Sequence, residues 1–368
     1  MKVFCNQKDL LNALNITSKA VSQNVVLPVL NNILIKTEGK EMHFAATNLE
    51  IAIKYRLQAD VRNEGAITVP AKLFTNYVAL LPDEKIELNL TDGLTLNVKS
   101  SNSQTKIKGI HPDEFPLIPK TEKETTLSVP AKELEKAINQ VVFSASVNTS
   151  RPVLSGVYFL FDKDILSLVA TDSYRLAERK IHIKKGKDGE RFECIVPAKT
   201  VMELSKLIQK TTENIEINAS KNQILFIIDG IEFTSRLIEG KFPDYERIMP
   251  KTSKTKILVD VPALELAAKR VSLFAREDGN SVKMSVTNDG KMLLSTEETK
   301  VGEEKAELNI SIEGENNKIA FNVQYLLDML QAVGDEKVFI ELNDKLSPIV
   351  VKPQKTADYT YIIMPLKI

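Results

Sequence analysis

The feature of this sequence best suited to electrostatic contact with a partner is a row of lysines on one predicted helix. Lys199, Lys206 and Lys210 lie at i, i+7 and i+11, so a helix that begins near residue 198 places all three on one side. A separate apolar stripe on the same helix is formed by Val201, Leu204, Leu207 and Ile208. Lysine is a compact, hydrated point charge on a flexible stem, so such a row can attract an anionic partner. The pattern predicts a helix that packs by one face and offers cations on the other, and an ordinary solvated face is the alternative.

Patterns that would support catalysis are scarce. The three histidines, His43, His111 and His182, are scattered along the chain, and His182 alternates with isoleucines as a solvent-side strand residue does. Asp162 and Asp164 resemble paired carboxylates, but their position between two apolar runs favours a turn. The sequence has no phosphate-binding glycine loop, dinucleotide-binding motif, HExxH or nucleophile elbow. We therefore expect no enzyme activity, no cofactor and no metal.

The elements that position these lysines follow a repeat. The tripeptide Val-Pro-Ala occurs four times, with prolines at residues 70, 130, 197 and 262, and a helical pattern follows each copy. Weaker copies at Asn6 and Asn322 fit the same spacing of 60 to 67 residues. Proline suits the first helical position because its φ is fixed and its missing N–H is not needed there. The spacing predicts six repeated units, each with a strand that passes sharply into a helix.

Composition limits the possible classes of protein. The 368 residues predict two or three domains at about 150 residues each. The 49 basic and 49 acidic residues cancel, so any positive surface must be local. Cys5 and Cys194 lie in apolar, strand-like runs, which favours buried thiols over ligands or nucleophiles. No signal-peptide core and no apolar run of roughly 18 residues is present, which predicts a soluble, cytosolic protein.

Between the helices, the sequence alternates between apolar and polar residues as half-buried strands do. Three Asp-Gly pairs, at residues 92–93, 229–230 and 289–290, separate such runs and predict hairpins. Each repeat therefore predicts one helix plus several antiparallel strands, an α+β fold.

A second signature groups the six units into three pairs. Segments 114–120, 241–251 and 363–367 share an apolar pair, a proline and a basic or near-basic ending, and polar linkers follow the first two. We expect three domains, at residues 1–119, 127–250 and 256–368. Sheets of this kind leave edge strands that a protein must cover or pair.

Several stretches carry a family resemblance. They are Ala170-Thr171-Asp172-Ser173-Tyr174-Arg175-Leu176-Ala177, the preceding segment 151–156, the later segment 239–250 and the terminal Met364-Pro365-Leu366. Together they closely resemble the bacterial DNA polymerase III beta subunit, the replicative sliding clamp. The resemblance covers the whole chain, because the repeat plan, the linkers and the terminus all match.

The resemblance implies a ring of two chains joined head to tail, each with three similar DNA-clamp domains of two helix-plus-strand units. Helices line the hole, sheets form the outer wall, and double-stranded DNA passes through, so retention comes from encirclement. The residues expected to face DNA are Lys72, Lys132, Lys136, Lys199, Lys206 and Lys210, together with Asn24 and Asn148. The two asparagines occupy positions where some clamps carry an arginine and a glutamine.

The resemblance also implies two protein-binding surfaces. A groove for short extended peptides, typically a glutamine followed by apolar residues, would bind the polymerase alpha subunit, the clamp loader, other polymerases and repair proteins. Its expected residues are Leu154, Thr171, Ser173, Tyr174, Arg175, Leu176, Pro243, Arg247, Ile248, Leu346, Ile362, Met364, Pro365 and Leu366. The subunit contact is expected at Leu273 and Phe274, with Ile107 as the counterpart on the partner chain.

Two other readings compete with the sliding clamp when the residues are taken alone. Internal repeats are compatible with a protein-interaction scaffold that does not encircle DNA. A DNA-processing enzyme would need clustered acids, histidines or a nucleotide loop, and the sequence offers none of these.

Overall fold

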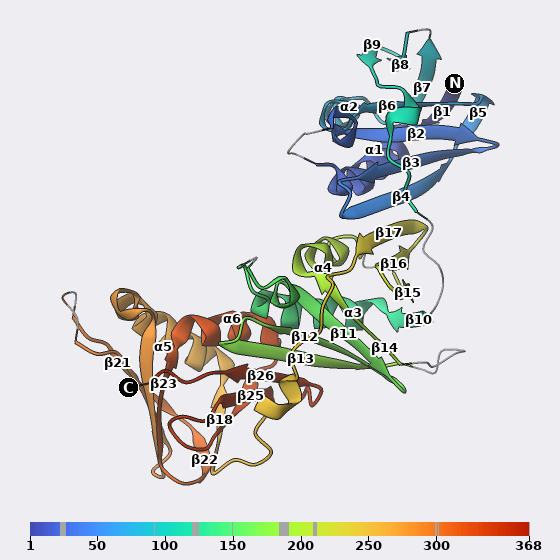
Figure 1. Ribbon diagram of the computed structural model, residues 1–368. Coiled ribbons are helices and arrows are strands. Elements are labelled where there is room, and N and C mark those ends of the chain that lie inside the picture. Colours follow the sequence, from blue (N-terminus) through green and yellow to red (C-terminus); the bar gives the residue numbers. More distant parts are fainter. Residues whose placement is uncertain are drawn as a thin grey trace. The chain divides into compact units, whose positions relative to one another are not determined.

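The computed structural model describes residues 1–22, 27–91, 93–119, 125–148, 150–183, 191–208, 212–298, 300 and 302–367 (Figure 1). These residues form two compact units, and each is described by itself. The first contains the described parts of 1–132 and 203–237, and the second those of 133–202 and 238–367.

Six α-helices occur within the described residues, one at each predicted start. They are α1 Gln7–Thr17, α2 Ala71–Ala79, α3 Ala131–Val141, α4 Ala198–Ser205, α5 Val261–Ala275 and α6 Val323–Val333. Short 3₁₀ turns are η1 Ser18–Ala20, η2 Pro28–Asn31, η3 Pro112–Glu114, η4 Val142–Ser144, η5 Pro152–Leu154, η6 Tyr245–Ile248 and η7 Arg276–Asp278. Helix α4 is shorter than the lysine row predicts, so Lys206 lies just beyond its end and Lys210 lies outside the described residues.

The helix starts differ in one respect from the prediction. Pro70 is not the first residue of α2 but the residue before it, with φ −56° and ψ 112°. The reason is that Pro70 still pairs with Asn32 in the neighbouring strand, so its backbone stays extended. In α5 the proline does lie inside the first turn, at Pro262. Helix α6 uses an ordinary cap, in which Gln324 N donates to the Asn322 side chain at 2.9 Å.

The first unit contains two antiparallel sheets. The five-stranded sheet runs in the order β5 Asp60–Asn63, β1 Lys2–Asn6, β7 Lys85–Thr91, β8 Thr95–Lys99 and β9 Gln104–Lys108. The eight-stranded sheet runs β10 Thr125–Pro130, β15 Asn214–Ala219, β16 Gln223–Ile228, β17 Ile231–Arg236, β4 Ile51–Gln58, β3 Glu41–Thr47, β2 Asn32–Glu38 and β6 Gly65–Pro70. Helices α1 and α2 pack against each other, and α1 also packs on β3 and β4.

The second unit also contains two antiparallel sheets. The nine-stranded sheet runs β14 Phe192–Pro197, β11 Gly156–Asp162, β12 Ile165–Thr171, β13 Arg175–His182, β26 Tyr359–Ile363, β25 Ile349–Pro353, β24 Lys337–Leu342, β18 Thr255–Asp260 and β22 Ser311–Gly314. The four-stranded sheet runs β21 Lys305–Asn309, β20 Lys291–Ser295, β19 Ser281–Thr287 and β23 Asn317–Asn322. Helices α5 and α6 lie side by side (Figure 1).

The predicted hairpins are present. Strands β7 and β8, β16 and β17, and β19 and β20 pair across the three Asp-Gly positions. Asp229 and Gly230 both have positive φ, 46° and 84°, which is the conformation of a two-residue hairpin turn. The Asp162–Asp164 segment is a turn as predicted, with Lys163 at φ 59°. His182 is exposed and Cys5 is buried as predicted, whereas Cys194 is only half-buried.

Within the described ranges, no helix has both the length and the apolar character that crossing a membrane requires.

Candidate functional site

The turn between β12 and β13 is held rigid by its own side chains. Thr171 Oγ1 accepts a hydrogen bond from Ser173 N at 3.1 Å and donates one to Arg175 O at 2.6 Å. Asp172 Oδ1 accepts from the backbone N–H groups of Tyr174 and Arg175 at 2.9 and 3.0 Å. Ser173 adopts a positive φ of 81°. The turn therefore presents Tyr174, 62% exposed, on the surface in a fixed position.

Arg175, the last residue of this turn, is fully engaged within the chain. Its Nε donates to Asp172 at 3.0 Å, its Nη2 to the Phe143 carbonyl at 2.8 Å, and its Nη1 to the carboxylate of Asp328. The guanidinium also lies over the Tyr325 ring, 4.7 Å from the centroid. Each of its three nitrogens therefore already donates to a partner within the chain, so Arg175 supports the turn.

The C-terminal segment lies against the same turn. Met364 N donates to Tyr174 O at 2.8 Å, and Leu366 N donates to Ala320 O at 2.8 Å. Met364, Pro365 and Leu366 are consequently half-buried. The prediction that this apolar tail docks on the protein is confirmed.

The segment after residue 238 forms another side of the site. Phe242 stacks on Tyr158 at 4.8 Å between centroids, and the Tyr245 hydroxyl donates to Glu178 at 2.9 Å. Burial, followed by the Glu178 charge, raises the pKa of Tyr245, which keeps its hydroxyl protonated. Anchoring at these two aromatic residues leaves three expected groove residues exposed: Pro243, Arg247 and Ile248.

The expected groove residues therefore differ in accessibility. Leu154, Thr171, Leu176 and Ile362 are buried, and Leu176 and Ile362 belong to one apolar cluster with Phe242 and Tyr245. Ser173 and Tyr174 are exposed on the turn, and Leu346 is 60% exposed on the loop between β24 and β25. A ligand on this surface would meet the exposed residues, with the buried ones beneath. Sequence reasoning missed the supports Asp172, Phe143, Tyr158 and Asp328, which no spacing pattern marks.

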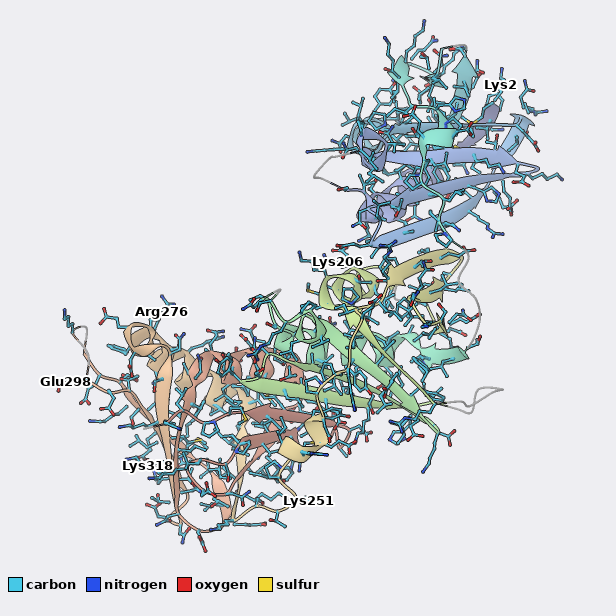
Figure 2. All side chains as sticks on the ribbon, in the orientation of Figure 1. Lys2, Lys206, Lys251, Arg276, Glu298 and Lys318 are labelled. Carbon is cyan, nitrogen blue, oxygen red and sulfur yellow. The ribbon has the colours of Figure 1, made fainter. Side chains whose placement is uncertain are left out.

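Of the lysines expected to face DNA, those on helices are exposed. Lys72 on α2, Lys132 and Lys136 on α3, and Lys199 on α4 have no ion pair with any described residue. Lys206, labelled at the end of α4 in Figure 2, pairs with Glu203 at 2.7 Å. Asn148 is exposed and accepts a hydrogen bond from Ser150 N at 2.9 Å. Asn24 and Lys210 lie outside the described residues.

The expected subunit-contact residues lie beside two edge strands. Leu273 on α5 is 60% exposed, and its neighbour Phe274 is half-buried. The Phe274 ring lies next to Gly302, with its Cε1 atom 3.7 Å from where a Cβ on that glycine would stand. Helix α5 packs against β21. Ile107 lies on β9 with its side chain buried. Among the described strands, β9 pairs only with β8 and β21 only with β20.

Comparison with known proteins identifies the family. Models of the N-terminal, central and C-terminal domains of the DNA polymerase III beta subunit match residues 1–119, 128–244 and 246–367. The beta sliding clamps of Staphylococcus epidermidis and Staphylococcus aureus are 32% and 31% identical, over all of both chains. The chain belongs to the DNA polymerase III beta subunit family.

Solved structures of beta subunits agree with this assignment. The Pseudomonas aeruginosa DNA polymerase III beta subunit matches at TM-score 0.96 and 28% identity, over 100% of both chains. The Bacillus subtilis DNA polymerase sliding clamp matches at TM-score 0.95 and 27% identity, over 100% of this chain and 99% of that one. The predicted α+β fold of three beta-clamp domains is confirmed, and the likenesses support a DNA sliding clamp role.

Proposed function

We propose that two copies of this chain close head to tail into a ring that encircles double-stranded DNA without sequence preference. The ring is a non-catalytic processivity factor that acts in the cytoplasm. It tethers the polymerase alpha subunit, the clamp loader, other polymerases and repair proteins through a peptide groove. Its domains span residues 1–119, 127–250 and 256–368. Membership in the sliding clamp family is the main support, and three features of the chain add to it.

The strand pairing of the sheets supports head-to-tail closure. Each domain has two helices, and the third strand after each helix forms a junction. After the first helix of each domain this strand is β4, β13 or β21. After the second helix it is β9, β17 or β26. Within the chain, β4 pairs with β17 and β13 with β26, so each junction joins one strand of each type. The remaining pair, β21 and β9, are edge strands among the described residues. Pairing β21 with β9 of a second copy repeats the same junction and covers both edges.

Exposed apolar residues flank both of these edges. Leu273 lies on α5, which packs against β21. On the other side, Leu73 of α2 is 57% exposed, and Tyr77 of the same helix bonds Ser103, just before β9, at 2.9 Å between hydroxyl oxygens. At the junction within the chain, α3 and α6 contact through Gln140 Nε2, which donates to Val333 O at 3.3 Å. The equivalent contact at the β21–β9 junction would join α5 of one chain to α2 of the partner chain, with Phe274 and Ile107 beside it.

The distribution of charge suits encirclement. The chain carries no net charge, yet four expected DNA-facing lysines have exposed ammonium groups without an ion pair among the described residues. Such groups supply a weak, sequence-independent attraction to phosphate. Asn24, Asn148, Lys206 and Lys210 complete the proposed DNA-facing set.

The peptide groove is proposed at the β12–β13 turn, the segment after residue 238 and the C-terminal tail. Tyr174, Ile248 and Leu346 are 62%, 41% and 60% exposed, and so offer apolar surface to a ligand there. The remaining proposed groove residues are Leu154, Thr171, Ser173, Arg175, Leu176, Pro243, Arg247, Ile362, Met364, Pro365 and Leu366.

Topology gives the decisive test. Protein deposited by a clamp loader on nicked circular DNA should remain bound, and cutting the circle should release it. Equal release from circular and linear DNA would contradict the ring and favour the scaffold reading. Nuclease or ATPase activity that a point substitution abolishes in the purified chain would contradict the non-catalytic assignment.

A further inference from the structure

The turn between β3 and β4 has its own network of side-chain hydrogen bonds. Thr47 Oγ1 accepts from Leu49 N at 3.0 Å and donates to Ile51 O at 2.8 Å. Asn48 Oδ1 accepts from the backbone N–H groups of Glu50 and Ile51 at 3.0 and 2.8 Å. Leu49 adopts a positive φ of 75°. Each of these four bonds, and the positive φ at the third residue, recurs in the β12–β13 turn of the proposed groove.

The end of the neighbouring strand also bonds to each turn in the same way: a backbone N–H donates to the carbonyl oxygen of the fourth residue of the turn. Arg236 N, at the end of β17, donates to Glu50 O at 2.9 Å. Met364 N, just after β26, donates to Tyr174 O at 2.8 Å. The junction of β4 with β17 is therefore built like the junction of β13 with β26, down to individual backbone bonds.

The β3–β4 turn borders a small cavity of about 110 Å³. Its apolar wall includes Leu49, Ile51, Pro116 and Leu117, and Leu117 is 96% exposed. A cavity of about 150 Å³ can hold benzene, so this one has room for a single branched apolar side chain. Polar side chains, among them Thr47, Gln223 and Thr234, complete the lining, so the cavity combines an apolar wall with polar groups, as binding sites commonly do.

The rim of the cavity carries charges that have no partner within the described chain. Glu50 and Arg236 are both exposed, and neither has an ion pair with a described residue. An arginine guanidinium binds a carboxylate through two parallel hydrogen bonds. The charge on Arg236 therefore complements an acidic side chain placed beside the apolar one.

We propose that this cavity is a second peptide-binding site, which takes an extended segment of a partner protein. One apolar side chain of the partner enters between Leu49 and Leu117, and a neighbouring carboxylate binds Arg236. The proposal rests on the proposed function, because the occupant is inferred from the equivalence of this junction to the groove.

The test uses the full chain with residues 364–368 deleted, which removes the tail of the groove. The protein carries ¹³C-labelled isoleucine and leucine methyl groups, and the probe is an acetylated peptide, Gln-Leu-Leu-Asp-Leu-Phe. Saturable shifts are expected at the Leu49, Ile51 and Leu117 methyls. Arg236→Ala should weaken binding about tenfold, as should replacing the peptide aspartate by asparagine. Arg56→Ala, an exposed arginine on β4, is the matched control and should change nothing.

The outcomes separate this inference from the proposed function. Absence of saturable shifts at these three residues would overturn the second site, while binding by the undeleted chain would still support the groove. Shifts here without any groove binding by the undeleted chain would overturn the groove and keep the second site. Shifts that depend on protein concentration without peptide would make a second copy of the chain the occupant, which also contradicts the proposal.

Discussion

Arg175 on β13 donates a hydrogen bond through Nη1 to the carboxylate of Asp328 on α6. Residues 153 positions apart are thereby joined at the turn that presents Tyr174. The shape of this turn depends on the α6 helix as well as on its own sequence.

Replacing Asp328 with Asn should weaken this connection. A hydrogen bond between charged groups contributes about 1.5–3 kcal/mol, so we expect the free energy of unfolding to fall by roughly 2 kcal/mol. Chemical denaturation measures this change. Arg175→Lys should weaken peptide binding, because lysine cannot bond Asp172, Asp328 and the Phe143 carbonyl in one plane and so cannot hold the turn in place. Unchanged peptide affinity in both variants would contradict the supporting role of Arg175.

Deleting residues 364–368 should abolish binding of the polymerase peptide to the groove and leave the dimer intact. The tail contacts the turn through Met364 N and follows β26 of the nine-stranded sheet, whereas β9 and β21 are edge strands of two other sheets. Fluorescence anisotropy at the groove and sedimentation of the dimer measure the two effects. Retained groove affinity would place the groove elsewhere.

Replacing both Leu273 and Phe274 with Ala should produce folded monomers. The change removes apolar area from the proposed interface, at about 25 cal/mol per Å² lost. Leu346→Ala is a matched control, since Leu346 is also 60% exposed but belongs to the groove. A dimer mass for the double variant in sedimentation velocity would count against the assignment.

Replacing Lys132 and Lys136 with Ala should weaken DNA association without changing its lack of sequence preference. Each lost phosphate contact should reduce the salt slope of the binding constant by about 1. Lys318→Ala, an exposed lysine on strand β23, is the control and should leave the slope unchanged. An identical slope for both variants would remove α3 from the DNA-facing set.

Cys5 should resist thiol reagents in the folded protein. Burial, followed by the Asp9 charge, raises the pKa of the Cys5 thiol to about 12. In a Cys194→Ser variant, the remaining thiol should react at pH 8 only after denaturation. Because the folded pKa lies above the unfolded value of about 9, the unfolded state releases its proton first, so this contribution to stability is lost between about pH 9 and pH 12. Fast reaction of the native variant would contradict burial.

Local signals predicted most of the fold. Helix starts followed from Val-Pro-Ala, and hairpins followed from Asp-Gly, because both depend on backbone preferences of neighbouring residues. Pro70 departs from its predicted helical position because a strand partner holds it extended.

The site was less accessible to sequence reasoning. The resemblance supplied the groove residues, but not their division into a buried floor of Leu176 and Ile362 and an exposed rim around Tyr174. The bond from Arg175 to Asp328 arises from tertiary packing, which no spacing along the chain reveals.

The proposed ring has three kinds of junction, each present twice, which share one design but differ in how they are fastened. Two of them, β4 with β17 and β13 with β26, lie within a single polypeptide. If such a strand pair separates, the chain keeps the two strands at a high effective concentration of each other, so the pair re-forms quickly. The junction of β21 with β9 is not bridged by continuous polypeptide, and while it is open only the second copy of the same junction holds the two chains together. The seam between subunits is therefore where the ring should part to admit DNA, and re-formation of rings from fully separated chains should slow on dilution, whereas the intrachain seams should not respond.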